Sequence, residues 1–344
     1  MNDPAKASAA GRPPTLDEVA KAAGVSRATA SRAINGLPYV SPTARAAVER
    51  AVQDLGYRAN QVARSLATKR TGAIALVVSE SEKFVVSDPF FARIMRGISG
   101  SLGENGLGLS LVMAKEHRGD DASLRSLREG HVDGVLLVSV HGGDVLAGQL
   151  LESGLPLVVC GRPLTTRAEV PYVDADNFNG ASMAARHLVD IGRQRIATIA
   201  GPRDMAVGID RLSGFRRGMA SSGPAPLAVE HGDFTMASGE AAMRRLLAAH
   251  PDLDAVFVAS DLMAVGAMRV LQAAGRSIPD DVAVVGFDDS DVAATAVPPL
   301  TTIRQPIEEL GRTMAWRLQA QLAGDPDLPP SILLPTEFVG RAST

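Results

Sequence analysis

The spacing of hydrophobic residues near the start of the chain predicts helices. Leu16, Val19 and Ala20 recur at helical intervals and would lie on one apolar face. Thr15 and Glu18 have the separation of a capping box, in which each side chain bonds the backbone N–H of the other residue. The pattern therefore predicts an amphipathic helix that begins directly after Thr15.

Two more helices are expected in the same region. Gly24 can adopt the left-handed backbone that ends a helix, and Ser26 can cap a second helix that runs to about Ile34. A third helix would start after Ser41 and end at Gly56. Two short helices around a glycine-centred turn, with a third beside them, predict a helix-turn-helix domain.

From Thr71 onward the pattern changes to alternating strands and helices. The apolar runs expected to form buried strands are Ile74–Val78, Leu109–Met113, Val135–Val138, Leu157–Val159, Ile196–Ile199, Ala255–Val258 and Val282–Val285. Amphipathic stretches separate them, which predicts parallel sheets with helical crossovers. A ligand is expected at the carboxyl ends of such strands.

Charge is distributed unevenly over the two regions. Residues 1–70 hold eleven Lys or Arg and five Asp or Glu, a formal charge of +6, and the whole chain carries −3, which leaves −9 for residues 71–344. A basic small domain on an acidic large one suggests that only the first meets a polyanion, although a solvated basic face would give the same count.

The second predicted helix carries the side chains best suited to read DNA. Its outward face would present Arg27, Thr29, Ser31 and Arg32, which can bond base edges or phosphates. Arg27 lies near the amino end of that helix, where its guanidinium could reach guanine O6 and N7. The sequence therefore predicts a DNA-reading helix.

Two long motifs resemble a known family. One comprises Thr15–Ser26 followed by Thr29, Ser31-Arg32 and Asn35, and the other comprises Leu55–Asn60 followed by Ala63–Leu66. Both are similar to the headpiece and hinge of the lactose-repressor (LacI/GalR) family of transcriptional regulators. Ala59 departs from the pattern, because that family usually has proline there.

The resemblance implies an all-α helix-turn-helix headpiece and an α/β periplasmic-binding-protein-like core of two lobes with parallel sheets. Residues 1–13 would be a disordered tail, 14–58 the headpiece, 59–71 a hinge helix and linker, and 72–344 the effector-binding and dimerisation domain. Lobe 1 is expected at about 72–173 and 303–330, and lobe 2 at about 174–302 and 331–344. The chain would cross between the lobes near Val173, Thr302 and Pro330.

The resemblance also implies a homodimer that binds a palindromic double-stranded operator, usually as a repressor. Asn60 to Thr68 would form a short helix when two copies meet in the minor groove, with Leu66 wedged between base steps. Alternatively, Val62 and Leu66 are linker residues packed on the core. DNA contacts are expected from Thr15, Ser26, Arg27, Ala28, Thr29, Ser31, Arg32, Asn35, Tyr57, Asn60, Ala63 and Leu66.

The effector site implied by the resemblance lies between the lobes. The residues expected to bind the effector are Phe90, Phe91, Arg211, Phe234, Asp261 and Asp288. A fixed arginine, carboxylates and an aromatic face suit a sugar or sugar phosphate. Asp261 could instead cap a helix, and Phe90 could belong to the core. Arg162 and Asp174 are weaker candidates that interlobe salt bridges or loop capping would explain equally.

Other classes of protein fit the sequence less well. A solute-binding protein for transport would need an export signal with an apolar region, and the chain has a basic headpiece instead. No nucleotide-binding, nucleophile-elbow or zinc-peptidase motif occurs, and the six histidines lack metal-ligand spacing. We expect no enzyme activity, no cofactor, no metal and no membrane association. The single cysteine, Cys160, fits a reducing cytoplasm.

Overall fold

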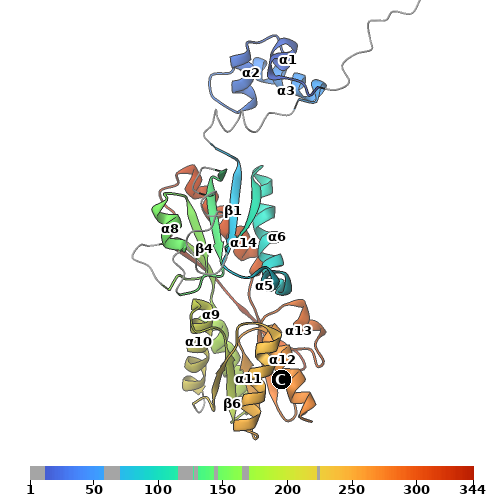
Figure 1. Ribbon diagram of the computed structural model, residues 1–344, viewed down its shortest axis with the longest axis vertical. Coiled ribbons are helices and arrows are strands. Elements are labelled where there is room, and N and C mark those ends of the chain that lie inside the picture. The colour runs from blue at the N-terminus through green and yellow to red at the C-terminus, as the bar shows by residue number, and fades with distance from the viewer. Residues whose placement is uncertain are drawn as a thin grey trace, which may run out of the picture. The chain divides into compact units, whose positions relative to one another are not determined.

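The computed structural model describes residues 12–57, 70–114, 127, 131–142, 146–164, 170–222 and 225–344. The chain forms two compact units, Met1–Thr71 and Gly72–Thr344 (Figure 1). The first described unit is helical and the second combines sheets with helices. None of the helices in these ranges is both long and apolar enough to cross a membrane.

The small unit is a three-helix headpiece. It comprises α1 (Leu16–Ala22), α2 (Arg27–Ile34) and α3 (Pro42–Leu55). The predicted capping box is confirmed, because Thr15 accepts from the Glu18 N–H while the Glu18 carboxylate accepts from the Thr15 N–H at 2.6 Å. Gly24 and Gly56 follow α1 and α3 with φ of 66° and 64°, the left-handed backbone that glycine adopts at low cost. The apolar core is formed by Val19, Ala20, Ala30, Ala33, Val48 and Ala51.

The large unit contains two six-stranded sheets. Sheet A has the order β11-β5-β4-β3-β1-β2, and sheet B has the order β12-β10-β9-β8-β6-β7. The strands of sheet A are β1 (Ala73–Val78), β2 (Gly108–Met113), β3 (Gly134–Val138), β4 (Leu157–Cys160), β5 (Tyr172–Ala175) and β11 (Ser331–Leu334). The strands of sheet B are β6 (Ile196–Ala200), β7 (Val229–His231), β8 (Ala255–Val258), β9 (Ala283–Asp288), β10 (Thr301–Arg304) and β12 (Glu337–Val339). All neighbours pair in parallel except β10 and β12, which are antiparallel.

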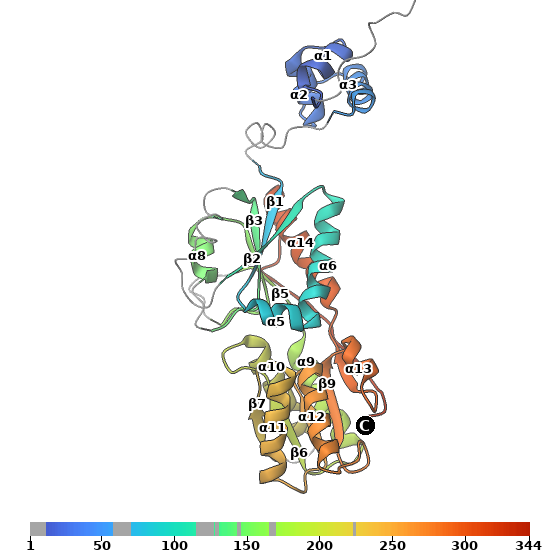
Figure 2. The same cartoon turned by 45° about the vertical axis from the view of Figure 1, so that its right-hand side comes forward.

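Helices cover both faces of each sheet. In lobe 1, which contains sheet A, α6 (Pro89–Glu104) and α14 (Ile307–Ala323) pack on one face and α8 (Leu146–Glu152) lies over the other (Figure 2). In lobe 2, which contains sheet B, α11 (Met236–Ala249) and α12 (Asp261–Ala273) pack on one face. The other face of sheet B is covered by α9 (Asn177–Asp190) and α10 (Ala206–Ser222). Two short helices, α5 (Glu82–Ser87) and α13 (Asp291–Thr295), follow β1 and β9.

Glycine allows α6 and α14 to approach closely. A Cβ at Gly97 would lie 2.0 Å from the Glu308 carbonyl oxygen, and one at Gly311 would lie 2.3 Å from that of Ile94. The two glycines therefore bring into contact helices that lie more than two hundred residues apart in the chain.

The chain crosses between the lobes later than the sequence indicated. Asp174 and Ala175 pair with β11 in sheet A, and Ile303 and Arg304 pair with β9 in sheet B. The residues 331–334, expected in lobe 2, form β11 of lobe 1. The predicted lobe boundaries are therefore wrong by a few residues at each crossing. The reason is that β11 is a short edge strand and apolar runs do not mark the last paired residue of a strand.

Candidate functional site

The amino end of α2 is fixed by a side-chain cap. Ser26 Oγ accepts from the Thr29 N–H at 3.1 Å and shares a hydrogen bond of 2.9 Å with Thr29 Oγ1. Arg27, the first residue of α2, keeps 72% of its side chain exposed and lies 3.4 Å from Asp17 of α1. The headpiece thus presents an exposed cation beside a capped helix end.

The other predicted DNA contacts differ in exposure. Ala28 and Arg32 are exposed on α2, and Ser31 is half-buried. The Asn35 amide donates to the Ser31 carbonyl at 2.9 Å, so it closes the last turn of α2. Tyr57 packs against the headpiece core. Asn60, Ala63 and Leu66 lie outside the described residues, as does the predicted hinge helix.

A cleft opens where the carboxyl ends of both sheets meet. Its walls are loops that follow the strands of sheet A and sheet B, together with side chains of α5, α6 and α10. The cleft encloses about 800 Å³ of space between atoms, its open mouth included. That volume is within the roughly 300–1,000 Å³ typical of small-molecule sites.

Aromatic rings line the cleft from both lobes. Phe84, Phe90 and Phe91 come from lobe 1, where Phe91 lies edge-on to Phe84 and to Phe90 at centroid distances of 5.9 and 5.4 Å. Phe234 comes from the loop after β7 and has a φ of 68°. Such rings can pack against the C–H face of a sugar, and their edge-on packing holds the lobe 1 cluster in place.

Arg211 is the most firmly positioned polar group in the cleft. Its side chain is 4% exposed, its guanidinium lies 3.7 Å from the centre of the Phe287 ring, and its Nε donates to Asn177 at 2.9 Å. Nη1 donates to the Ala259 carbonyl at 2.6 Å and to Asp288 at 3.3 Å. These partners fix the plane of the guanidinium, which is a permanent cation in the lining of the cleft.

Carboxyl groups surround this cation. Asp288 accepts from Gln305 at 2.6 Å, and burial raises the pKa of Asp288 although Arg211 lowers it. Burial raises the pKa of Asp174 to about 6, and burial also raises the pKa of Asp88. All three line the cleft, so its polar lining is richer in hydrogen-bond acceptors than in cations.

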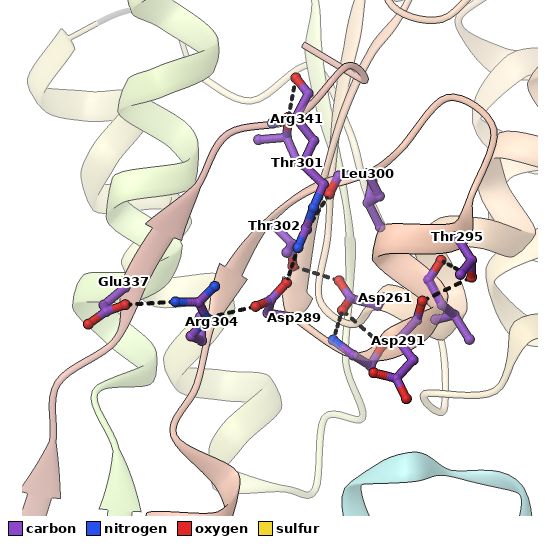
Figure 3. A network of polar contacts seen from close by, with 12 residues as sticks. Asp261, Asp289, Asp291, Thr295, Leu300, Thr301, Thr302, Arg304, Glu337 and Arg341 are labelled. Atoms are coloured by element: carbon purple, nitrogen blue, oxygen red, sulfur yellow. Dashed lines mark hydrogen bonds and ion pairs between the residues drawn. The ribbon is translucent and has the colours of Figure 1, made fainter.

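Asp261 does not join this group, contrary to the sequence-based prediction. It is fully buried, and its carboxylate accepts from Thr302 Oγ1 at 2.6 Å and from the N–H of Ser290 at 2.8 Å (Figure 3). Nor is it the helix cap, because Ser260 caps α12. Asp261 instead joins the start of α12 to β10 and to the residues after β9.

The structure places Asp289 away from the cation of the cleft. Arg304 and Arg341 both pair with its carboxylate (Figure 3). Asp288 and Asp289 have φ of 118° and 52°, a backbone region that non-glycine residues occupy at a cost. The two arginines and the buried Asp261 therefore hold a strained turn that presents Asp288 to Arg211.

The structure brings together five of the six predicted effector residues and adds others. Phe90, Phe91, Arg211, Phe234 and Asp288 line one cleft, with Phe84, Asn177, Ser260 and Gln305, which the sequence analysis missed. Asn177, Ser260 and Gln305 each follow a strand within two residues. Polar residues at strand ends were therefore the available signal.

Arg162, one of the two weaker candidates, links the lobes. Arg162 pairs with Asp210 of α10 at 2.8 Å, and its N–H donates to Asp174 at 3.1 Å. A second link is formed by His141 of lobe 1, whose Nδ1 lies 2.8 Å from Oδ2 of Asp204 in lobe 2. Within the described ranges, no group of three or more His, Cys, Asp or Glu residues is arranged to hold a metal ion.

Comparisons with known proteins agree with this architecture. Residues 15–60 match the family of "Bacterial regulatory proteins, lacI family", and residues 185–344 match the "Periplasmic binding protein-like domain". The chain is 47% identical over 335 residues to the HTH-type transcriptional regulator CelR of Thermobifida fusca, covering 96% of this chain and 98% of that one. It is 32% identical over 339 residues to the transcriptional repressor CytR of Escherichia coli (strain K12), covering 96% of each.

Two solved structures are similar over nearly the whole chain. A transcriptional regulator CelR–cellobiose complex has a TM-score of 0.74 and 46% identity, covering 96% of this chain and 100% of that one. The lac repressor dimer bound to operator and the anti-inducer ONPF has a TM-score of 0.81 and 28% identity, covering 97% and 99%.

The fold and the cleft define a DNA-binding regulator with a ligand-sensing core, and the chain belongs to the LacI family of bacterial regulatory proteins. It is a transcriptional regulator and not an enzyme.

Proposed function

We propose that this chain represses transcription by binding a palindromic operator as a homodimer, and that a sugar in the cleft controls its affinity for that operator. The observation that carries the proposal is the cleft itself, where an immobilised Arg211 is surrounded by acceptors and aromatic rings. A chain that binds an operator acts in the cytoplasm.

The headpiece supplies the support for DNA reading. Ser26 and Thr29 hold the amino end of α2, and Arg27 extends from that end with an exposed side chain. A helix held in this way can enter the major groove, where arginine recognises guanine with two hydrogen bonds. We assign the remaining predicted contacts to the same interface. One headpiece covers one half-site, and two copies related by a twofold axis cover a palindrome.

The cleft chemistry favours a neutral sugar over a sugar phosphate. Asp88, Asp174 and Asp288 line the cleft beside Arg211 and Arg162, so a phosphate would meet more anionic than cationic groups. Neighbouring sugar hydroxyls can donate to the carboxylates and accept from Arg211. The CelR relative was solved with cellobiose, which makes cellobiose the first compound to test.

Control of DNA binding requires that the sugar bind two arrangements of the lobes unequally. The pairs Arg162–Asp210 and His141–Asp204 cross between the lobes. A sugar that contacts both lobes would favour the arrangement in which these pairs form. The difference in sugar-binding free energy between the two lobe arrangements then appears as a change in operator affinity.

The DNA arm of the proposal is tested by fluorescence anisotropy on a palindromic duplex and on a half-site, at several salt concentrations. We expect Arg27→Ala to weaken binding by about 1–3 kcal/mol and to relax the preference at one base position. Arg50→Ala removes the same charge from an exposed site on α3 and serves as the matched control. Binding without sequence preference or salt dependence would overturn the proposal.

The effector arm is tested by isothermal calorimetry with cellobiose, glucose and glucose 6-phosphate. We expect a neutral sugar to bind, and its addition to change operator affinity. Arg211→Lys keeps the charge but loses the planar pattern of donors, so it should weaken sugar binding while operator binding without sugar persists. Preference for the phosphate, or no binding by any sugar, would contradict the assigned effector class.

A further inference from the structure

A second hollow adjoins the cleft and has a different lining. The two spaces share Phe84, Met205 and Phe234, which therefore form a partition between them. On the inner side of the partition lie Arg211, Phe90 and Phe91. The outer hollow is lined mainly by polar side chains, including Glu80, His141 and Asp204.

Both lobes contribute to the outer hollow. Glu80 follows β1 and His141 follows β3 in lobe 1, whereas Asp204 and Asp233 follow β6 and β7 in lobe 2. His141 lies between two of these carboxylates, with Nε2 at 3.1 Å from Glu80 Oε1 and Nδ1 at 2.8 Å from Asp204 Oδ2. A carboxylate only accepts hydrogen bonds, so a histidine held by two of them is an imidazolium.

This bridge uses one oxygen of each carboxylate. Glu80 Oε1 accepts from His141 and from Ser139 Oγ at 2.7 Å, and Asp204 Oδ2 accepts from His141. Within the part of the chain that the structure describes, no residue donates to Glu80 Oε2 or to Asp204 Oδ1. The outer hollow thus offers one acceptor from each lobe, and its complement is a ligand with several hydroxyl donors.

The partition suits the apolar face of such a ligand. Phe234 holds its left-handed backbone because Asp233 Oδ1 accepts from the N–H and the hydroxyl of Thr235, at 3.0 and 2.6 Å. The Phe234 ring is thereby fixed at the junction of the two spaces. A strained backbone with this much support is typical of functional sites.

We propose that the outer hollow is a second sugar subsite, which takes the next ring of an oligosaccharide whose first ring lies beside Arg211. The inference rests on the proposed sugar effector and adds the length of that sugar. The glycosidic link is surrounded by Phe84, Met205 and Phe234. The carboxylates of Glu80 and Asp204 accept hydrogen bonds from hydroxyl groups of the outer ring. Because these two acceptors come from different lobes, the second ring also stabilises the lobe arrangement in which His141 pairs with Asp204.

The test compares cellobiose with glucose by calorimetry on the full chain and on the double variant Glu80→Gln/Asp204→Asn. Each amide keeps one oxygen to accept from His141 and replaces the second oxygen with a donor. We expect wild-type protein to bind cellobiose at least about tenfold more tightly than glucose, and the variant to lose about tenfold for cellobiose alone.

Asp252→Asn is the matched control, since Asp252 pairs with Arg195 on lobe 2 and lines neither hollow. It should bind both sugars as wild type does. If Glu80 and Asp204 only hold the two lobes together, the double variant should lower the affinity for cellobiose and for glucose by the same factor, because both sugars bind the same arrangement of the lobes. That result, or equal wild-type affinity for the two sugars, would overturn the outer subsite while leaving the sugar effector intact. Absence of binding by either sugar would overturn the effector class as well.

Discussion

The headpiece and the core are stabilised in different ways. The headpiece core consists of six buried residues, all valine or alanine, and its helices begin and end at strong local caps. Four clusters of larger apolar side chains fill the core unit, and its glycines allow close contacts between distant helices. Local sequence therefore specifies the headpiece, whereas long-range packing specifies the core.

Function divides along the same line. The headpiece presents exposed polar groups on a helix held by its own neighbours in sequence. The effector cleft is assembled from strand ends that lie far apart in the chain. Changes in one unit should therefore affect one activity strongly and the other only through their coupling.

The largest effect is expected from Arg211→Ala. Removal of the guanidinium leaves the Asp288 carboxylate without its cation and Asn177 Oδ1 without its donor, which should cost the core about 3–5 kcal/mol. Sugar affinity should fall by about 10- to 100-fold. Differential scanning calorimetry should show a lower transition for the core and an unchanged one for the headpiece. A shift of the headpiece transition alone would contradict the assignment of Arg211 to the stability of the core.

Val19→Ala should have the next largest effect. Val19 is fully buried in the headpiece, and its truncation should cost about 2 kcal/mol. So small a domain has little stability to lose, so operator binding should fall sharply at 37 °C while sugar binding persists. Val256→Ala in the core is the matched control, because Val256 is equally buried. If only Val256→Ala lost DNA binding, operator binding would depend on the stability of the core and not on that of the headpiece.

Thr15→Ala should act more weakly and only on the headpiece. It removes the hydroxyl that accepts from Glu18 at the start of α1, which should cost about 1 kcal/mol. Thermal unfolding followed by circular dichroism should report a lower headpiece transition. Thr15→Ser keeps the cap and should behave as wild type, so equal losses in the two variants would argue against a capping role.

The smallest effect is a pH dependence confined to the core. Hydrogen bonds with Glu80, and less strongly with Asp204, raise the pKa of His141 to about 9 from 6.5. The protonated form is favoured in the folded state. Its contribution is therefore complete below about pH 6.5 and is lost as the pH rises through about 9. Partial exposure limits the contribution to below about 1 kcal/mol.

His141→Gln should flatten the fall in core stability between pH 6.5 and 9.5. The headpiece contains no histidine, so its own unfolding should not change over that pH range. Calorimetric scans at each pH separate the two transitions. A parallel decrease in both units would show that His141 is not the titrating group.

The sequence alone determined the elements that depend on near neighbours. Thr15, Ser26, Gly24 and Gly56 specify helix ends through bonds and backbone preferences within a few residues. The buried apolar runs specified most strands of both sheets. The family resemblance implied Arg211 and Phe234 as effector-binding residues, and both line the cleft.

The contacts of each strand-end residue depend on long-range packing and could not be predicted from the sequence. Asp261 lies one residue beyond Ser260, yet Ser260 lines the cleft and Asp261 is buried against Thr302. A shift of one position turns a side chain to the opposite side of the backbone, and no local pattern reports which side faces a ligand. The same holds for β11 and for the Glu80–His141–Asp204 bridge, because their partners come from distant parts of the chain.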